Sequence, residues 1–164
     1  MAWLMSVWTW LRGVCASVAF LFAAAFPPHG DMDSAAKGMA ADMPAFERMR
    51  DVLAAQPGIR WVTPSDDMNE LFGRNPYPVA PGARAGYREL AQFLKVRGFR
   101  DIAPVRNDGR LESFRLVMVD EGYRGRQKLV EGVWLADGVP ISQYTVNARC
   151  RAVRAPHWHV CELN

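Results

Sequence analysis

The sequence is poor in the residues that carry ligand and nucleophile chemistry. Its 164 residues include three cysteines and three histidines. It has no paired CxxC motif of the kind that holds structural zinc and no GxSxG motif of a serine hydrolase. The stretch GYRGRQK lacks the spacing of a phosphate-binding loop. These absences predict that the protein has no cofactor and make an enzyme the less favoured interpretation. Catalytic groups that are far apart in the sequence can still meet in the folded protein.

The chain also lacks a concentration of one charge. Its formal net charge is +3, and its arginines are spread among acidic residues. This distribution argues against a nucleic-acid interface, which needs a basic patch or arm. The densest basic group, Arg124, Arg126 and Lys128, is interpreted as a solvated turn between strands. The acidic residues of note are interpreted as helix-start, strand or turn charges: Asp66, Asp67, Glu70, Glu112, Asp120 and Glu131.

Residues 1–26 contain no acidic residue and one basic residue, Arg12. A run of small and apolar residues follows from Gly13 to Phe26, and Ala23-Ala24-Ala25 offers a small-residue cleavage site. A transmembrane helix needs about 20 apolar residues, so this run fits the core of a secretory signal peptide better.

Two other interpretations of residues 1–26 remain open. The segment could be a retained membrane anchor from Trp3 to Phe26, with Arg12 in the membrane at a cost of roughly 2.5 kcal/mol or more. It could also be an ordinary buried helix. Cleaved signal and retained anchor both predict export, with the remainder in the periplasm or anchored facing it. We expect a flexible linker over 27–42, rich in proline, glycine and small residues, and a single domain over 43–164.

The first half of that domain predicts two or three helices. Phe46, Met49 and Leu53 make an apolar stripe that Pro57-Gly58 ends. A short helix is predicted to start near Thr63 and to end before Gly73, and the proline-rich stretch 75–83 is expected to be extended. The clearest helix covers about 85–97, where the apolar stripe consists of Tyr87, Leu90, Ala91 and Leu94.

From Phe99 onward the pattern changes to strands and tight turns. We expect strands near 101–106, 111–119, 128–136, 139–153 and 158–163, with turns at Asn107-Asp108-Gly109 and Asp137-Gly138. Helices followed by strands predict an α+β fold, with an antiparallel meander of about four or five strands and a helix packed on one face. The turn at 137–138 would pair Trp134 with Ile141, and a bulge near Ser142 or Gln143 would restore the later alternation.

The segment CRAVRAPHWHVC, residues 150–161, holds two cysteines and two histidines. If Arg154 to His157 form a four-residue loop, Val153 faces Trp158, and the same register places Cys150 opposite Cys161. Directly opposed residues have Cβ atoms about 4.5–5.5 Å apart, close enough for a disulfide after modest adjustment. Because export leads to oxidising surroundings, the sequence predicts a Cys150–Cys161 disulfide.

A metal site is the alternative interpretation of the same segment. His157, His159 and Cys161 alternate along the predicted strand and Cys150 faces Cys161, so the four residues form a possible set of two nitrogen and two sulfur ligands for zinc or copper. His157 lies in the predicted turn, which argues against convergence.

The function expected from these features is protein–protein binding. We predict a small exported envelope protein that serves as an accessory or structural component of an envelope assembly. Two alternatives are a periplasmic inhibitor or immunity protein against a toxin, and a metal-binding protein that uses the His/Cys cluster. The predicted partner is a protein of unknown identity, with membrane contact through residues 1–26 if the leader is retained, and no nucleic acid.

Overall fold

The computed structural model describes residues 31–65, 79–123, 126–144 and 147–163. The predicted leader at 1–26 lies outside these residues. So does most of the short helix predicted before Gly73. No helix in the described ranges is long and apolar enough to cross a membrane.

Three α-helices of the described residues precede the strands. Helix α2 (Met32–Ala41) begins at Asp31, whose carboxylate accepts a hydrogen bond from the Ser34 amide at 2.7 Å. Helix α3 (Met43–Ala55) follows almost at once, with a proline in its first turn. A short 3₁₀ turn, η1 (Pro81–Ala83), leads into α5 (Arg84–Arg97). Gly98 ends α5 in the left-handed conformation that a helix C-terminus favours (φ 67°).

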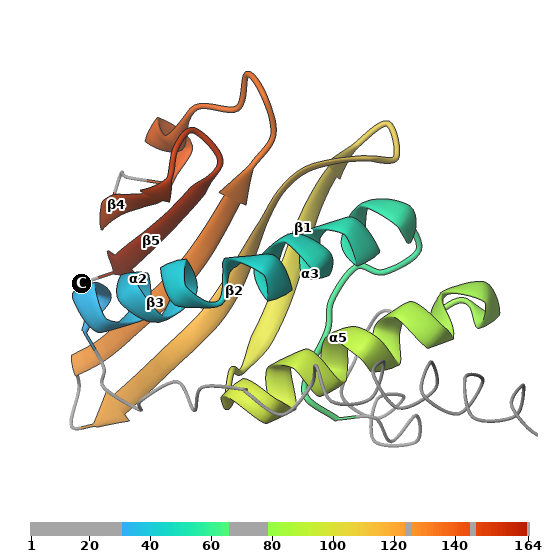
Figure 1. Ribbon diagram of the computed structural model, residues 1–164, viewed down its shortest axis with the longest axis horizontal. Helices are drawn as coiled ribbons and strands as arrows, with labels where there is room; N and C mark the ends of the chain where they lie inside the picture. Colours follow the sequence, from blue (N-terminus) through green and yellow to red (C-terminus); the bar gives the residue numbers. More distant parts are fainter. Residues whose placement is uncertain (1–30, 66–78, 124–125, 145–146, 164) are drawn as a thin grey trace, which may run out of the picture.

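Five strands of the described residues form one antiparallel sheet (Figure 1): β1 (Asp101–Asn107), β2 (Arg110–Tyr123), β3 (Arg126–Leu135), β4 (Ala148–Arg154) and β5 (Trp158–Leu163). Their order across the sheet is β1-β2-β3-β5-β4. The last strand of the chain therefore lies between β3 and β4, and β4 forms an edge. The predicted α+β fold, with helices and an antiparallel sheet, is confirmed.

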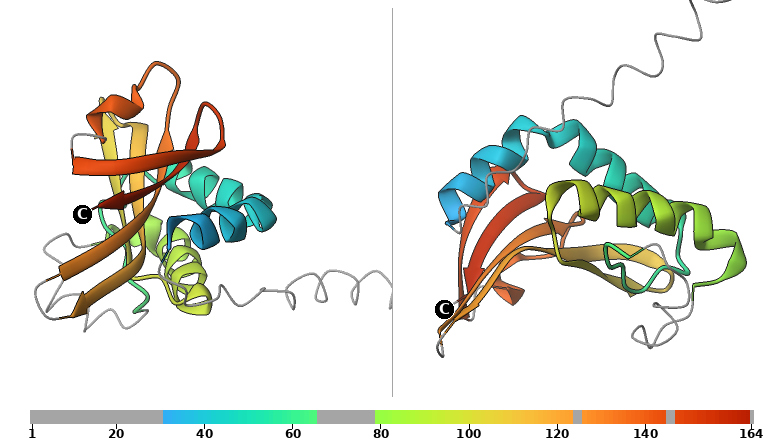
Figure 2. Two further views of the ribbon diagram at one scale, coloured as in Figure 1. Left: turned by 90° about the vertical axis from the view of Figure 1, so that its left-hand side faces the viewer. Right: turned by 90° about the horizontal axis from the view of Figure 1, so that it is seen from below.

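All three helices lie on one side of the curved sheet (Figure 2). The core between them is rich in aromatic rings: Phe46 of α3 contacts Phe93 of α5 and Trp158 of β5 edge to face. Gly132 of β3 lies beneath α2, because a Cβ atom there would stand 2.7 Å from the Met39 methyl group. The helix layer thus packs closely onto the middle of the sheet.

The prediction of a flexible linker over 27–42 is wrong for residues 32–41, because Met32–Ala41 form helix α2. Ala35, Ala36 and Met39 are buried against the sheet. The sequence pattern did not predict this helix, because its alanines and glycine give no clear alternation of apolar and polar residues. Alanine nevertheless favours the helical conformation. Of the stretch expected to be extended, residues 79–83 are described, and Pro81–Ala83 form a 3₁₀ turn instead.

The expected meander is also wrong beyond β3. Trp134 pairs with Trp158 of β5, not with Ile141. No strand occupies 139–144, where η2 (Ile141–Gln143) is a 3₁₀ turn, so the bulge expected near Ser142 or Gln143 is absent. The apolar side chains there leave the alternating pattern because they pack onto the sheet face opposite the helices, which we call the second face.

Candidate functional site

The C-terminal hairpin of β4 and β5 contains the predicted disulfide. Cys150 and Cys161 are bonded, and the two residues are directly paired across the strands. The predicted register holds from Ala148 to Ala152 and then shifts. A bulge lets Arg154, not Val153, pair with Trp158. The register expected from the sequence therefore predicted the disulfide, but it did not predict the bulge beside the turn.

The spacing of the cysteines shows which backbone groups β4 turns outward. Their Cα atoms are 4.1 Å apart, the short spacing of a non-hydrogen-bonded antiparallel pair. In such a pair the N–H and C=O groups point away from the partner strand. The backbone groups of Cys150 therefore point toward the outer edge. Those of Ala148 and Ala152 do the same, because they are two residues away on either side of Cys150. Among the described residues, no strand pairs with that edge.

Ionic contacts hold β4 to the helix layer. Arg151 forms an ion pair with Asp33 of α2 at 2.6 Å, and Arg154 reaches Glu47 of α3 at 3.3 Å. Both arginine side chains are more than half exposed. Such exposed pairs contribute little to stability, about 1 kcal/mol or less each. The disulfide and the backbone ladder with β5 are therefore the main attachments of this edge.

The two histidines of the segment do not join the cysteines in a ligand set. His157 lies in the turn, where its Nδ1 is 2.9 Å from the Leu135 carbonyl oxygen. His159 is partly buried in β5, and burial lowers the pKa of its imidazole. Within the described ranges no three His, Cys, Asp or Glu side chains are grouped as metal ligands. The four-residue metal set fails because a disulfide uses both thiols.

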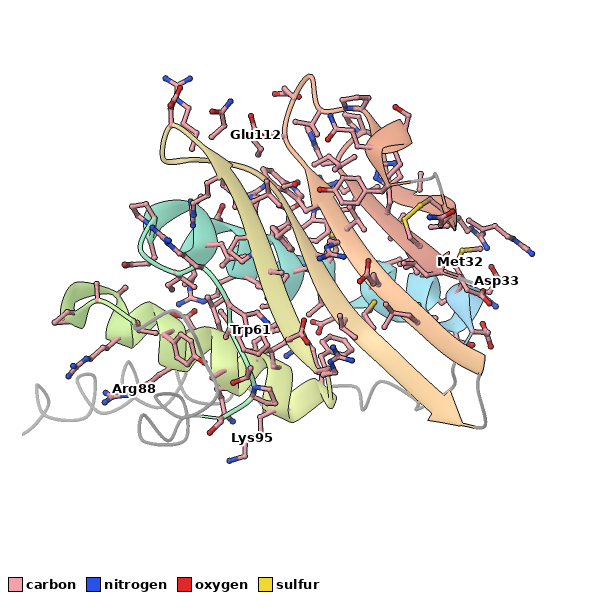
Figure 3. All side chains as sticks on the ribbon, turned by 180° about the vertical axis from the view of Figure 1, so that it is seen from behind. Met32, Asp33, Trp61, Arg88, Lys95 and Glu112 are labelled. Atoms are coloured by element: carbon pink, nitrogen blue, oxygen red, sulfur yellow. A yellow bond between two sulfur atoms is a disulfide. The ribbon has the colours of Figure 1, made fainter. Side chains whose placement is uncertain are left out.

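The second face of the sheet carries a small apolar cluster and a cavity. Val133, Leu135 and Cys161 are buried there, and the connection from β3 to β4 folds over them. Tyr144 is held in this connection by a 2.5 Å hydrogen bond between its hydroxyl and that of Ser113 on β2. Figure 3 views this face, with α2 and α3 behind the strands. Beside the cluster is an open cavity of about 300 Å³, lined by residues of β2, β3, β4, β5 and the connection.

Glu131 is the buried charge of this cavity. The residue is 4% exposed, and its carboxylate pairs with Arg115 of β2, with 3.6 Å between Nη1 and Oε1. Burial raises the pKa of the Glu131 carboxyl, Arg115 opposes that shift, and Asp101 adds to it. A distance of 3.6 Å is too long for a hydrogen bond, so the pair is loose.

The sequence interpretation of Glu131 as an ordinary strand charge is wrong, since the residue is buried at a cavity wall. One signal was available. Glu131 alternates with Leu129, Val133 and Leu135, so it is a charge in the middle of an apolar strand face.

Comparisons with known proteins give no relative for this chain. No family model, curated protein or solved structure matches it.

Proposed function

We propose that this protein is exported and acts by binding another protein, which adds an extended segment to the outer edge of β4. The observation that carries the proposal is the outward-facing backbone of that edge, which no described strand pairs with. Strand addition of this kind obtains its affinity from main-chain hydrogen bonds and its specificity from alternate side chains. The apolar leader supports a location in the periplasm, either free or anchored to the membrane, where an envelope assembly would provide the partner.

The edge is prepared for such pairing. The disulfide joins the middle of β4 to β5, whose other side is paired with β3. A strand fixed in this way loses little conformational entropy when a partner binds, and this preorganisation favours affinity. Native proteins usually protect exposed edges with charge or with very short strands. Here the edge has seven residues, and two of its three arginines, Arg149 and Arg151, lie on one face.

Those charges indicate the chemistry of the partner. Arg149 and Arg151 share the face of β4 that carries the helices, and both are exposed. On the other face, Ala148 and Ala152 are small and leave room for larger side chains. A complementary segment would therefore have acidic residues on one face and apolar residues on the other, because opposite charges across paired strands stabilise the pair.

The proposal is tested by site-specific photo-crosslinking in the native host. A photoreactive residue at Arg149 should give an adduct with one envelope protein. The same residue at Arg88 on α5, far from β4 (Figure 3), should not. Equal adducts at both positions, or none at Arg149, would contradict the proposal.

A backbone variant tests whether strand pairing makes the contact. Ala152→Pro removes an outward N–H donor without removing a hydrogen bond to β5, so the domain should keep its fold and its disulfide. The Arg149 adduct should fall at least about tenfold in this background. Ala152→Thr is the matched control, since it keeps the donor, and its adduct should be unchanged. An adduct that survives Ala152→Pro would exclude strand addition.

A further inference from the structure

The cavity on the second face contains an unusual pair of charged groups. Glu131 comes from β3 and Arg115 from β2, and both line the space of about 300 Å³. Glu131 is almost fully enclosed, whereas the Arg115 side chain is 47% exposed. The acidic group therefore lies at the inner wall and the basic group nearer the opening.

The Glu131 carboxylate is only weakly paired among the described residues. In the described part of the chain it receives no hydrogen bond, and its ion pair with Arg115 is 3.6 Å long. Buried carboxylates are otherwise paired and hydrogen-bonded, because their desolvation is costly. An incompletely satisfied carboxylate at a cavity wall is suited to receive charge-assisted hydrogen bonds from a bound donor.

The rest of the lining limits the kind of ligand. Gln143 and Asn147 of the connection contribute amides, while Ala148 and Leu163 supply the partly exposed apolar surface of the lining. The volume is at the lower end of small-molecule sites, which begin near 300 Å³. A metal ion does not fit this lining, because Glu131 is its single carboxylate and Arg115 stands beside it.

We propose that this cavity binds a small zwitterion of the α-amino acid class with an aliphatic side chain. The ligand ammonium donates to Glu131, its carboxylate accepts from Arg115, and its side chain contacts Ala148 and Leu163. Ammonium and carboxylate groups on one carbon lie about 3 Å apart by standard bond geometry, which matches the separation of Glu131 and Arg115. A simple amine would meet the repulsion of Arg115, and a simple carboxylate that of Glu131.

The site is tested by calorimetric titration of the full chain in mild detergent with L-leucine. Leucine is expected to bind saturably. Isoamylamine, which lacks the carboxylate, and isocaproate, which lacks the ammonium, should each bind at least about tenfold more weakly. No leucine binding up to about 10 mM, or equal binding of either analogue, would refute the zwitterion site.

Matched variants locate the binding. Glu131→Gln and Arg115→Gln should each weaken leucine binding by at least about tenfold. Arg88→Gln, an exposed arginine on α5, should leave it unchanged. Glu131→Gln preserves side-chain shape, so the fold should survive, and an unchanged circular dichroism spectrum checks this. Leucine binding that persists in both cavity variants would place the ligand elsewhere. The titration is independent of the partner at the β4 edge, so either proposal can fail alone.

Discussion

Reduction of the Cys150–Cys161 disulfide should lower the free energy of unfolding by about 3 kcal/mol. The two cysteines are 11 positions apart, so the cross-link closes a short loop. In the chain-entropy model the bond acts mainly by restricting the unfolded chain, and a loop of about a dozen residues corresponds to roughly 3 kcal/mol at room temperature. Residual hairpin structure in the unfolded chain would reduce this value.

Other contacts of β4 cannot replace the bond. The ion pairs of Arg151 with Asp33 and of Arg154 with Glu47 are exposed, and each contributes about 1 kcal/mol or less. The ladder with β5 remains after reduction, but β4 has no strand on its other side within the described residues. We therefore expect β4 to be the first strand to lose amide protection in the reduced protein.

The measurement is urea unfolding followed by tryptophan fluorescence, with and without reductant. Trp158 is 1% exposed at the start of β5 and reports the loss of this hairpin from the core. The reduced protein should unfold at lower urea, and its Tm should fall by roughly 10 °C. The control is the double variant Cys150→Ala with Cys161→Ala, which should respond to reductant not at all. A loss below about 1 kcal/mol on reduction would refute the cross-link argument.

Two further predictions concern the core and the second face. Phe46→Ala should lower the free energy of unfolding by about 3–5 kcal/mol, because it leaves a cavity between Phe93 and Trp158. Phe46→Leu should cost much less, because leucine refills most of that volume. Urea unfolding measures both losses, and equal losses would contradict the cavity argument. The pKa of Glu131 in the folded protein is raised above its ordinary value of 4.5. The folded state therefore holds this proton more tightly than the unfolded state does. The free energy of unfolding falls as the pH rises from the pKa of Glu131 in the unfolded chain to its pKa in the folded protein. Glu131→Gln should therefore be more stable than the wild type at neutral pH, and its stability should depend less on pH between acid and neutral conditions. Lower stability of the variant at neutral pH, measured by urea unfolding, would contradict the expected direction of the effect.

Local patterns predicted much of the fold. The stripe of α5, the glycine at its end and the turn at Asn107-Asp108-Gly109 all act within a few residues, so their signals are complete in the sequence. The disulfide also belongs to this group, because a short hairpin converts sequence spacing into cross-strand pairing.

The strand order could not be predicted in the same way. Asp137-Gly138 does form a tight turn, with the Val139 amide bonded to the Ala136 carbonyl at 3.2 Å. A turn fixes the direction of the next few residues but not the strand that follows. Burial of Val139 and Ile141 on the second face competes with pairing along β3, and β5 takes that position instead. Such a choice depends on contacts far apart in sequence.

This strand order places β5, with His159 and Cys161, inside the sheet. In a simple meander β5 would be the outer strand, and its alternating His159 and Cys161 would lie at an open edge. Inserted between β3 and β4, β5 instead directs Cys161 toward Glu131, its direct neighbour on β3. Cys161 is buried in the sheet and lines the cavity, whereas Cys150 lies on the edge strand β4. The disulfide therefore joins the edge strand to a residue of the cavity wall.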